Sequence, residues 1–301
     1  MRLGRRIFET KITSFWPMLT YFISDIHVDF YCPQSANYDT LVPCFEDFYE
    51  KYFLPADAVC IAGDIANDYF TQASFLRFLS AKYGNVYAVF GNHDLVVSGA
   101  TFGNGNPFST SQERMDAVKR SLIDLTNVHI LDGNVVDGIG GSMGMCDLKY
   151  SCSTTVNVNI VMEWQRLWFD GRHWRYDLDN GNQWSRNDPM KIWTYEKAKM
   201  DAALALNPSV MVTHFCPTQM GVADNYKEDY ATAFFYFDGE EFLSKMKPGS
   251  IWQCGHTHST WDTEYNGVRI ICNPLGYPDE QNGFMLNKEN GTFLIDVCPE
   301  G

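Results

Sequence analysis

Five of the seven histidines in this 301-residue chain fall in short polar clusters with the donor atoms that metal ions need. These histidines are His27, His93, His214, His256 and His258. Three further side chains in the clusters, Asp25, Asp64 and Asn92, add oxygen donors. Imidazole nitrogen with carboxylate and amide oxygen, and no thiolate, suits Mn²⁺, Fe, Zn²⁺ or Ni²⁺ better than Ca²⁺ or Mg²⁺. Even without His93, the seven remaining side chains exceed what one tetrahedral ion needs, so we expect two metals that share a bridging carboxylate.

Each cluster directly follows a short apolar run rich in β-branched and aromatic residues, which predicts a strand buried on both faces. The five runs are Thr20–Ser24, Ala58–Ala62, Val86–Phe90, Ser209–Thr213 and Ser250–Cys254. Asp25 and His27 lie two residues apart at a strand end and therefore point to the same side. His256 and His258 repeat that spacing.

Two more apolar runs, Val268–Cys272 and Thr292–Val297, predict strands without such clusters. Apolar spacing near 3.6 predicts helices between the strands. The helical ranges are Thr40–Phe53, Thr71–Tyr83, Ser111–Leu125, Tyr195–Leu206 and Gly239–Met246. Thr110 and Glu113 are spaced as a capping box for the third helix. Alternating strands and helices indicate an α/β fold with a largely parallel sheet, whose ligands bind beyond the carboxyl ends of the strands.

The clusters taken together resemble the five sequence blocks of the calcineurin-like metallophosphoesterases. The blocks are Asp25-x-His27, Gly63-Asp64, Gly91-Asn92-His93-Asp94, His214 and Gly255-His256-Thr257-His258, in the family's order. Any one residue has a simpler explanation, such as a helix cap for Asp64, a turn for Asn92 or a core position for His214. All five blocks in order at strand ends favour the family. The resemblance implies a four-layer sandwich of two mixed β-sheets flanked by helices.

The resemblance also implies hydrolysis of phosphate esters by a hydroxide that bridges two divalent metals, with manganese the first choice and Fe, Zn or Ni the alternatives. Asp25, His27 and His258 would hold one metal and Asn92, His214 and His256 the other, with Asp64 bridging them. His93 would contact the phosphate, as Asn92 also would, and protonate the leaving oxygen, while Asp94 would orient the His93 imidazole. Two alternatives stay open: a phosphodiesterase specialised for cyclic or small nucleotides, and a metal-bearing interaction module without turnover.

Three positions bear on the subfamily. Purple acid phosphatases place a tyrosine where this chain has Asn67 and lack the histidine of the first block, so we expect no tyrosinate-to-iron colour. Asp68 follows the second block and is expected to cap the next helix. Asn273, in Asn273-Pro274-Leu275-Gly276-Tyr277, either lines the site or serves a turn, and the turn is the favoured interpretation.

Residues 140–195 interrupt the alternation and hold five of the eight tryptophans. The tryptophans are Trp164, Trp168, Trp174, Trp184 and Trp193, and they lie among Arg166, Arg172, His173, Arg175 and Arg186. Such a segment could grip a second phosphate through Arg172 and Arg175, or stack a base. The favoured alternative packs the tryptophans on the core and turns the arginines to solvent. We interpret the segment as an insert within one domain, residues 18–301, preceded by an extension over residues 1–17.

Composition limits the partners. Thirty-seven acidic against 23 basic residues give a net charge of -14, which argues against stable nucleic-acid binding. A phosphorylated small molecule or a nucleotide stays possible as substrate, because a local metal charge outweighs the global field. Nothing in the sequence identifies a protein partner.

The nine cysteines show no CxxC pair, and several lie in apolar runs, so we expect buried free thiols in a reducing compartment and no disulfide framework. Arg2, Arg5 and Arg6 precede the apolar stretch Phe15–Ile23 in the manner of a signal peptide. Cleavage there would remove the first predicted strand, and no run reaches the roughly 18 apolar residues of a membrane span. The expectation is therefore a cytoplasmic protein without membrane association, for which Met18 is a possible start.

Overall fold

The computed structural model describes residues 17–97, 107–178 and 187–298, and in these ranges two β-sheets pack face to face. The first sheet has the order β11 (Leu294–Val297), β1 (Met18–Ile23), β2 (Ala58–Ala62), β3 (Asn85–Val89) and β4 (Val128–Ile130). The second has the order β5 (Asn134–Val136), β6 (Ile139–Gly141), β7 (Val210–Val212), β8 (Ile251–Cys254), β10 (Val268–Cys272) and β9 (Trp261–Tyr265).

Both sheets have a parallel centre, with an antiparallel strand at one edge of the first sheet and at both edges of the second. Strands β1 to β4 run parallel, and β11 pairs antiparallel with β1. In the second sheet β6, β7, β8 and β10 run parallel, while β5 and β9 pair antiparallel. All seven strands expected from the sequence are present, with ends that differ by up to two residues. The fold class inferred from the sequence, a sandwich of two mixed sheets, is confirmed.

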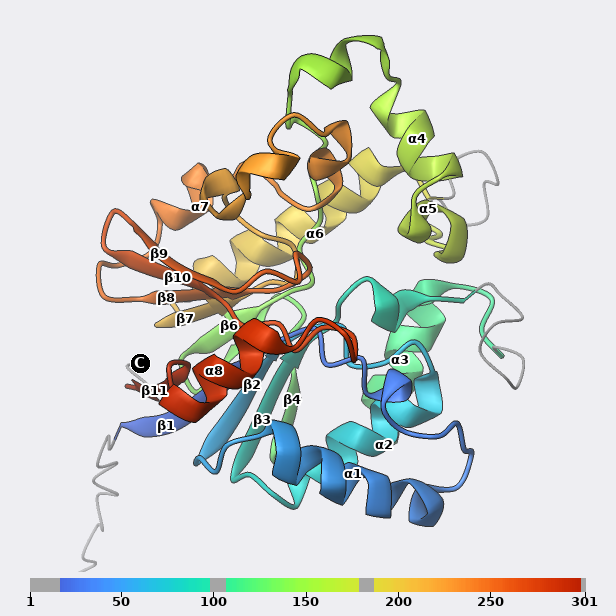
Figure 1. Cartoon of the computed structure of the whole chain (residues 1–301), viewed down its shortest axis with the longest axis vertical. Coiled ribbons are helices and arrows are strands. Elements are labelled where there is room, and N and C mark those ends of the chain that lie inside the picture. The colour runs from blue at the N-terminus through green and yellow to red at the C-terminus, as the bar shows by residue number, and fades with distance from the viewer. Residues whose placement is uncertain (1–16, 98–106, 179–186, 299–301) are drawn as a thin grey trace, which may run out of the picture.

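Helices cover the outer faces of the sandwich, as Figure 1 shows. Helices α1 (Tyr38–Tyr52), α2 (Tyr69–Ser80) and α3 (Ser111–Ser121) belong to the half built on β1–β4, and α6 (Pro189–Leu204) and α7 (Glu240–Leu243) to the other half. The capping box of Thr110 and Glu113 is confirmed, and the Asp68 carboxylate accepts a hydrogen bond from the Thr71 amide at 2.8 Å, as a cap should. Short elements escaped sequence prediction: β4, β5, β6, β9, α4 (Ile160–Arg166), α5 (Phe169–His173) and α8 (Asn282–Asn290).

A buried glutamine ties the two sheets together. Phe22, Tyr87, Val212 and Ile271 belong to the apolar layer between the sheets, where each is almost fully buried. The Gln253 side chain of β8 crosses this layer and donates hydrogen bonds to the carbonyls of Ile23 (2.8 Å) and Cys60 (3.1 Å). Because these carbonyls belong to β1 and β2, the carboxyl ends of both sheets are held at one place.

The insert packs largely as the favoured hypothesis expected. Trp164 and Trp174 are buried and contact each other at a centroid distance of 5.8 Å. Arg166, Arg172 and Arg175 are exposed. Trp184 and Arg186 lie outside the described residues, as do most of the N-terminal extension and the Gly99–Gly105 loop.

The expectation that all cysteines are free is wrong for one pair. Cys32 and Cys44 form a disulfide, because the chain before α1 folds back onto the first turns of that helix and brings the two Cα atoms to 5.8 Å. Cys60, Cys146, Cys216, Cys254 and Cys272 are free and buried, as expected. Within the described part of the chain, no helix combines the length and the apolar character needed to cross a bilayer.

Candidate metal centre

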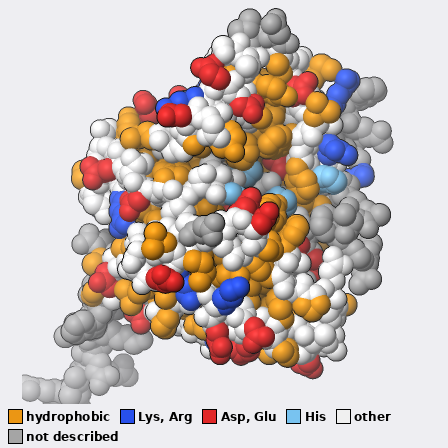
Figure 2. Space-filling model, in the orientation of Figure 1, with side chains coloured by type: hydrophobic (Ala, Val, Ile, Leu, Met, Phe, Trp, Pro, Cys, Tyr) orange, Lys and Arg blue, Asp and Glu red, His pale blue; other side chains and the backbone are white. Residues whose placement is uncertain are grey.

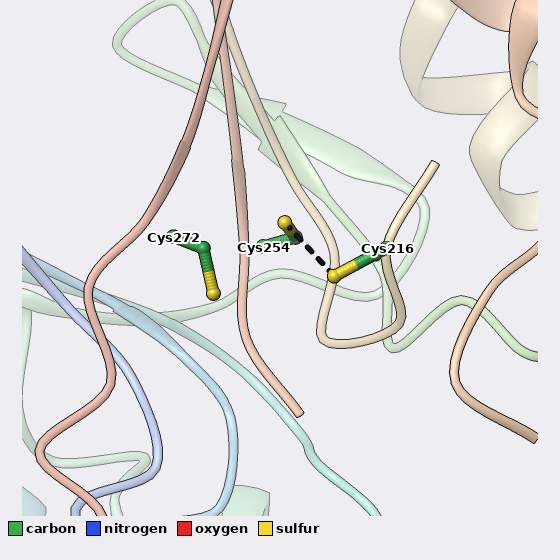
Figure 3. Close-up of side chains that lie close together, drawn as sticks. All are labelled: Cys216, Cys254 and Cys272. Carbon is green, nitrogen blue, oxygen red and sulfur yellow. Dashed lines mark hydrogen bonds between the residues drawn. The ribbon is translucent and has the colours of Figure 1, made fainter. Parts of the chain in front are cut away.

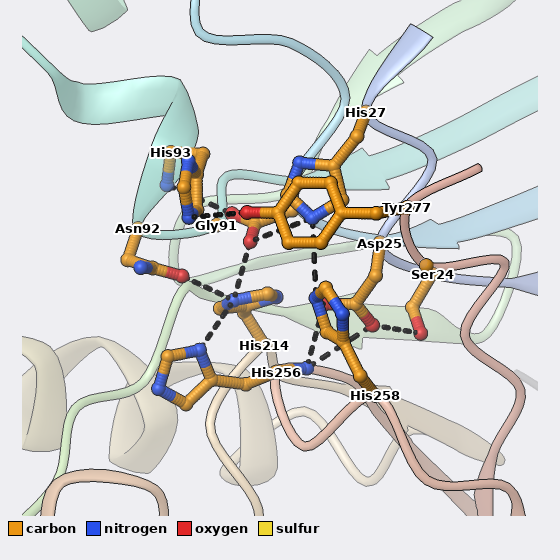
Figure 4. A network of polar contacts seen from close by, with 12 residues as sticks. Ser24, Asp25, His27, Gly91, Asn92, His93, His214, His256, His258 and Tyr277 are labelled. Carbon is orange, nitrogen blue, oxygen red and sulfur yellow. Dashed lines mark hydrogen bonds and ion pairs between the residues drawn. The ribbon is translucent and has the colours of Figure 1, made fainter. Parts of the chain in front are cut away.

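The seven expected metal ligands lie together where the strands of both sheets end, and Figure 4 labels all of them except Asp64. Asp25 and His27 follow β1, Asp64 follows β2 and Asn92 follows β3. From the second sheet, His214 follows β7, while His256 and His258 follow β8. The parallel strands therefore deliver to one point side chains that are up to 233 residues apart in the sequence.

Five of the seven residues adopt a left-handed backbone conformation that non-glycine residues rarely use. The φ angles are 50° at Asp25, 44° at His27, 55° at Asp64, 69° at His256 and 48° at His258. Each such position costs about 1–3 kcal/mol and persists only where its surroundings enforce it. Hydrogen bonds from backbone amides enforce the conformation here: the His27 amide donates to the Asp64 carbonyl at 2.9 Å, and the His256 amide donates to the Asp25 carboxylate at 2.9 Å.

The glycine of the third block is needed for close approach. A Cβ atom at Gly91 would lie 2.2 Å from Oδ1 of Asp64. That oxygen accepts a hydrogen bond from the His93 amide at 2.8 Å. Any larger residue at position 91 would therefore displace Asp64.

The first group of donors has the spacing of ligands around one ion. Nε2 of His27 lies 3.2 Å from Nε2 of His258 and 3.7 Å from Oδ2 of Asp64, and Nε2 of His258 lies 3.5 Å from Oδ1 of Asp25. Ligands bonded at about 2.0–2.2 Å to a common ion stand about 3.0–3.5 Å apart. The residues present therefore fit a divalent ion.

The second group shares Asp64 with the first. Nε2 of His214 lies 3.4 Å from Oδ2 of Asp64, 2.8 Å from Oδ1 of Asn92 and 3.2 Å from Nδ1 of His256. The same carboxylate oxygen thus faces both groups, which is the arrangement of a bridging ligand.

Hydrogen bonds behind the imidazoles fix which nitrogen faces the centre. Nδ1 of His214 donates to the Ala62 carbonyl at 2.8 Å, Nδ1 of His258 to Glu280 at 2.6 Å, and Nε2 of His256 to the Phe234 carbonyl at 3.3 Å. With these tautomers the lone pair of the opposite ring nitrogen points inward, as metal ligation requires.

Burial and neighbouring charges shift the pKa values of the side chains in the centre. Burial raises the pKa of Asp25 to about 6 and lowers the pKa values of His27 and His256 well below the usual 6.5. For His214, burial opposes protonation, but the Asp64 carboxylate outweighs it and raises the pKa to about 10. Against its burial, the nearby carboxylates also raise the pKa of His258, so two of the four imidazoles favour the charged form and two the neutral form. Buried carboxylates beside the two neutral imidazoles form a site that cations stabilise.

His93 stands beside the donors with a different set of contacts. Its Nδ1 donates to Oδ1 of Asn67 at 2.6 Å, and the Asn67 amide in turn donates to Asp29 at 3.1 Å. The ring stacks on Phe169 at a centroid distance of 4.4 Å, and Nε2 lies 3.5 Å from the Tyr277 hydroxyl. Burial lowers the pKa of His93 to about 4.

The role expected for Asp94 is wrong. Its carboxylate accepts hydrogen bonds from the backbone amides of Gly91 (2.8 Å), Ile65 (2.9 Å) and Ala66 (3.1 Å). The 3-10 turn His93–Leu95 points this side chain into the loop after β2, away from the imidazole. Asp94 therefore joins two ligand-bearing loops, and Asn67 makes the bond to His93 that was assigned to it.

Comparison with known proteins agrees with this geometry. The family model described as "Calcineurin-like phosphoesterase" matches residues 18–260. The chain belongs to this family. It is a metal-dependent phosphoesterase of the calcineurin-like type, as its donor groups suggest.

Two individual relatives extend the match over most of the chain. The uncharacterized protein L509 of Acanthamoeba polyphaga mimivirus is 24% identical over 279 residues, which cover 87% of this chain and 92% of that protein. The crystal structure of phosphopantetheinyl hydrolase (PptH) from Mycobacterium tuberculosis superimposes with a TM-score of 0.65 at 17% identity, covering 94% and 96% of the two chains. At 17% sequence identity, the structural similarity to the hydrolase shows a common fold.

Three residues considered from the sequence as substrate contacts, although another role was favoured for each, do not reach the centre of this phosphoesterase. Asn273 is buried and donates to the Phe22 carbonyl at 2.8 Å, so it links the two sheets. Arg172 and Arg175 are exposed and do not line the cavity above the centre. Of the insert, Trp168 and Phe169 line the cavity instead.

The insert supplies contacts that sequence reasoning missed. The Asn92 amide nitrogen donates to Asp170 at 2.8 Å, which turns the Asn92 oxygen toward His214. The indole of Trp174 donates to the Asn92 carbonyl at 2.7 Å. Aspartate and tryptophan in an irregular segment carry no recognisable spacing, so only the folded chain shows that they support a ligand.

A cavity of about 560 Å³ lies over the metal centre. We call the seven expected ligands its floor, although only Asp64, Asn92, His256 and His258 of them line the cavity itself. We call the segments 164–174 and 219–236 its roof, although only some of their residues line the cavity, among them Trp168, Phe169, Val222, Tyr226 and Phe235. Figure 2 looks onto the hollow, where histidine side chains are visible between hydrophobic ones and acidic side chains lie at the rim.

Three free thiols lie beneath the floor. The sulfur atoms of Cys216, Cys254 and Cys272 lie within 4.8 Å of one another, and Figure 3 shows them coming from the loop after β7 and from the ends of β8 and β10. The Cys216 thiol is 3.1 Å from the Gly255 carbonyl, next to His256. These thiols pack with Val222 and Tyr236, so they support the turn that carries His256.

Proposed function

We propose that this protein hydrolyses phosphate esters with two divalent metal ions, of which Mn²⁺ is the first candidate. Asp25, His27 and His258 would hold one ion, Asn92, His214 and His256 the other, and Asp64 both. The observation that carries the proposal is the pair of overlapping donor groups with Asp64 in common. Ions bound there would lower the pKa of water to about 7 and neutralise charge on the phosphoryl oxygens.

His93 is proposed as the acid that protonates the leaving oxygen. Its Nδ1 is committed to Asn67, so a transferable proton would be held at Nε2, which faces the cavity. With a pKa of about 4 the free imidazole is largely unprotonated at neutral pH, so the role needs the negative charge of a bound phosphate to raise that pKa. Asn92 and His93 are proposed to contact the phosphate.

The substrate is proposed to be a phosphorylated small molecule or a nucleotide, and either a phosphatase or a phosphodiesterase fits the centre. The interaction module without turnover is disfavoured, because the floor is complete and His93 faces the cavity beside it. The cytoplasm stays the proposed compartment, which imaging of the tagged protein in its host would test.

The test is a paired assay on protein loaded with Mn²⁺, with p-nitrophenyl phosphate and bis-p-nitrophenyl phosphate as substrates. Metal-dependent turnover that is lost in Asp64→Asn is expected. His93→Asn should also reduce it, through the lost contact to the phosphate, although p-nitrophenolate needs little protonation. The preferred ester separates phosphatase from phosphodiesterase. Absence of turnover with two metals bound would support the interaction module.

We also propose that residues 18–301 form one domain and that residues 1–17 contribute nothing to its stability or activity. A protein starting at Met18 is expected to retain the thermal unfolding midpoint and the specific activity of the full chain. Loss of folding in the shorter protein would refute this division.

A further inference from the structure

The cavity has two chemically different ends. Its floor presents oxygen and nitrogen donors, whereas its roof presents the side chains of Trp168, Val222, Tyr226 and Phe235. The rings of Trp168 and Phe235 pack edge to face at a centroid distance of 5.4 Å. Aromatic walls of this kind favour flat apolar groups, because they bury large areas at small entropic cost.

Charge sharpens the contrast between the two ends. Among the described residues, no lysine or arginine lines the cavity, while Asp229 and Glu280 do. Glu280 is paired with His258 at 2.6 Å. The exposed Asp229 carboxylate accepts a hydrogen bond from the Ala231 amide at 2.9 Å and faces no described cation of the lining. A second phosphate or carboxylate on the substrate would need guanidinium or ammonium partners, which this lining does not offer.

We infer that the substrate ester carries, beside its phosphate, a flat apolar group without further negative charge, which binds against Trp168 and Phe235. The inference rests on the proposed function and narrows its substrate class. The alternative, in which arginines of the insert bind a second phosphate, does not fit the cavity, because Arg172 and Arg175 lie outside it. One phosphoryl group fits the floor, and an uncharged organic group fits the roof.

The experiment compares esters that share a leaving group. The full chain loaded with Mn²⁺ is assayed with p-nitrophenyl esters of methyl phosphate, phenyl phosphate and 4-carboxyphenyl phosphate. We expect kcat/KM for the phenyl ester to exceed both others by about tenfold, the order of discrimination that one apolar contact or one unmatched charge gives. If only monoesters are hydrolysed, 2-naphthyl phosphate and its 6-carboxylate form the equivalent pair.

Variants locate the effect in the roof. Trp168→Ala should reduce the preference for the phenyl over the methyl ester to less than about threefold. Leu167→Ala is the matched control, because Leu167 is adjacent in sequence but 66% exposed and outside the cavity. Tyr226→Ala, at a side chain that is 54% exposed, gives the same test should Trp168→Ala fail to fold. Asp229→Asn keeps the hydrogen bond to the Ala231 amide and should raise kcat/KM for the carboxylated ester relative to kcat/KM for the neutral ester.

The outcomes separate this inference from the function on which it rests. Equal kcat/KM for the neutral and carboxylated esters, or a preference that survives Trp168→Ala and Tyr226→Ala, would overturn the inference and leave the phosphoesterase activity standing. If metal-loaded protein hydrolyses none of the esters, the proposed function fails and the inference fails with it.

Discussion

The floor and the roof of the cavity are built by different means. Floor residues follow buried strands directly, and backbone bonds such as that from the His27 amide to the Asp64 carbonyl hold them. The roof consists of short helices and turns held by side chains, as in the stacking of Phe169 on His93. Sheet topology therefore fixes the positions of the candidate metal ligands, while side-chain packing shapes the walls against which the inferred organic group would bind. The two regions meet at Asn92, which Asp170 of the roof orients.

The largest effect is expected where the two donor groups share a ligand. Asp64→Asn should reduce kcat/KM by on the order of 10³-fold, because the amide lacks the charge that compensates two divalent ions. The pair of assays is turnover with saturating Mn²⁺ and metal content after gel filtration. A variant that retains two metals and more than a tenth of the activity would show that Asp64 does not bridge.

The floor could be predicted from the sequence because strand ends are local signals. A buried strand followed by aspartate or histidine places that residue at the carboxyl edge, and parallel pairing then brings such edges together. This logic predicted that the seven candidate ligands lie together, and in the structure they do. It failed for Asp94, because sequence position does not say whether a side chain after a 3-10 turn points to the imidazole or to a neighbouring loop. It also gave no sign that Glu280 would sit behind His258.

The second largest effect tests whether the roof supports the floor. Asp170→Ala removes the acceptor of the Asn92 amide nitrogen, so this amide is free to rotate its oxygen away from His214. Supporting contacts of this kind change metal affinity by about 10–100-fold. Calorimetric titration with Mn²⁺ should show weaker binding at one of two sites, with Glu163→Gln in α4 as control. Unchanged affinity at both sites would mean that floor and roof are independent.

The roof could not be predicted at this level of detail. Its elements are short, and the helices α4 and α5 together hold only 12 residues, too few for a clear periodicity. Burial of Trp164 and Trp174 was expected because tryptophan is a large apolar residue. The contacts of Asp170 and Phe169, however, depend on how the insert folds back onto the strand ends. Packing between distant segments carries that information.

His93 is held from both sides, so it allows a direct comparison of the two regions. Asn67, in the loop after β2, bonds its Nδ1, and Asn67→Ala should reduce kcat by about 10–100-fold because the ring loses its orientation and tautomer. Metal affinity should stay within about twofold of wild type, since Asn67 touches none of the floor ligands. A parallel loss of metal would show that Asn67 acts through the floor instead.

Phe169 holds the same imidazole from the roof, and its effect should be the smallest. An aromatic stacking contact contributes about 1 kcal/mol, so Phe169→Leu should reduce kcat by about fivefold. Leucine fills most of the space and leaves the Asn67 bond intact, so the proton stays on the same nitrogen and only the position of the ring becomes less defined. The leaving group supplies the decisive control: esters of acidic phenols need little protonation and should be almost insensitive to Phe169→Leu, whereas alkyl esters should show the full loss. An equal loss for both would mean that Phe169 shapes the binding of the ester and not the position of His93, which would place it with Trp168 among the residues that recognise the organic group.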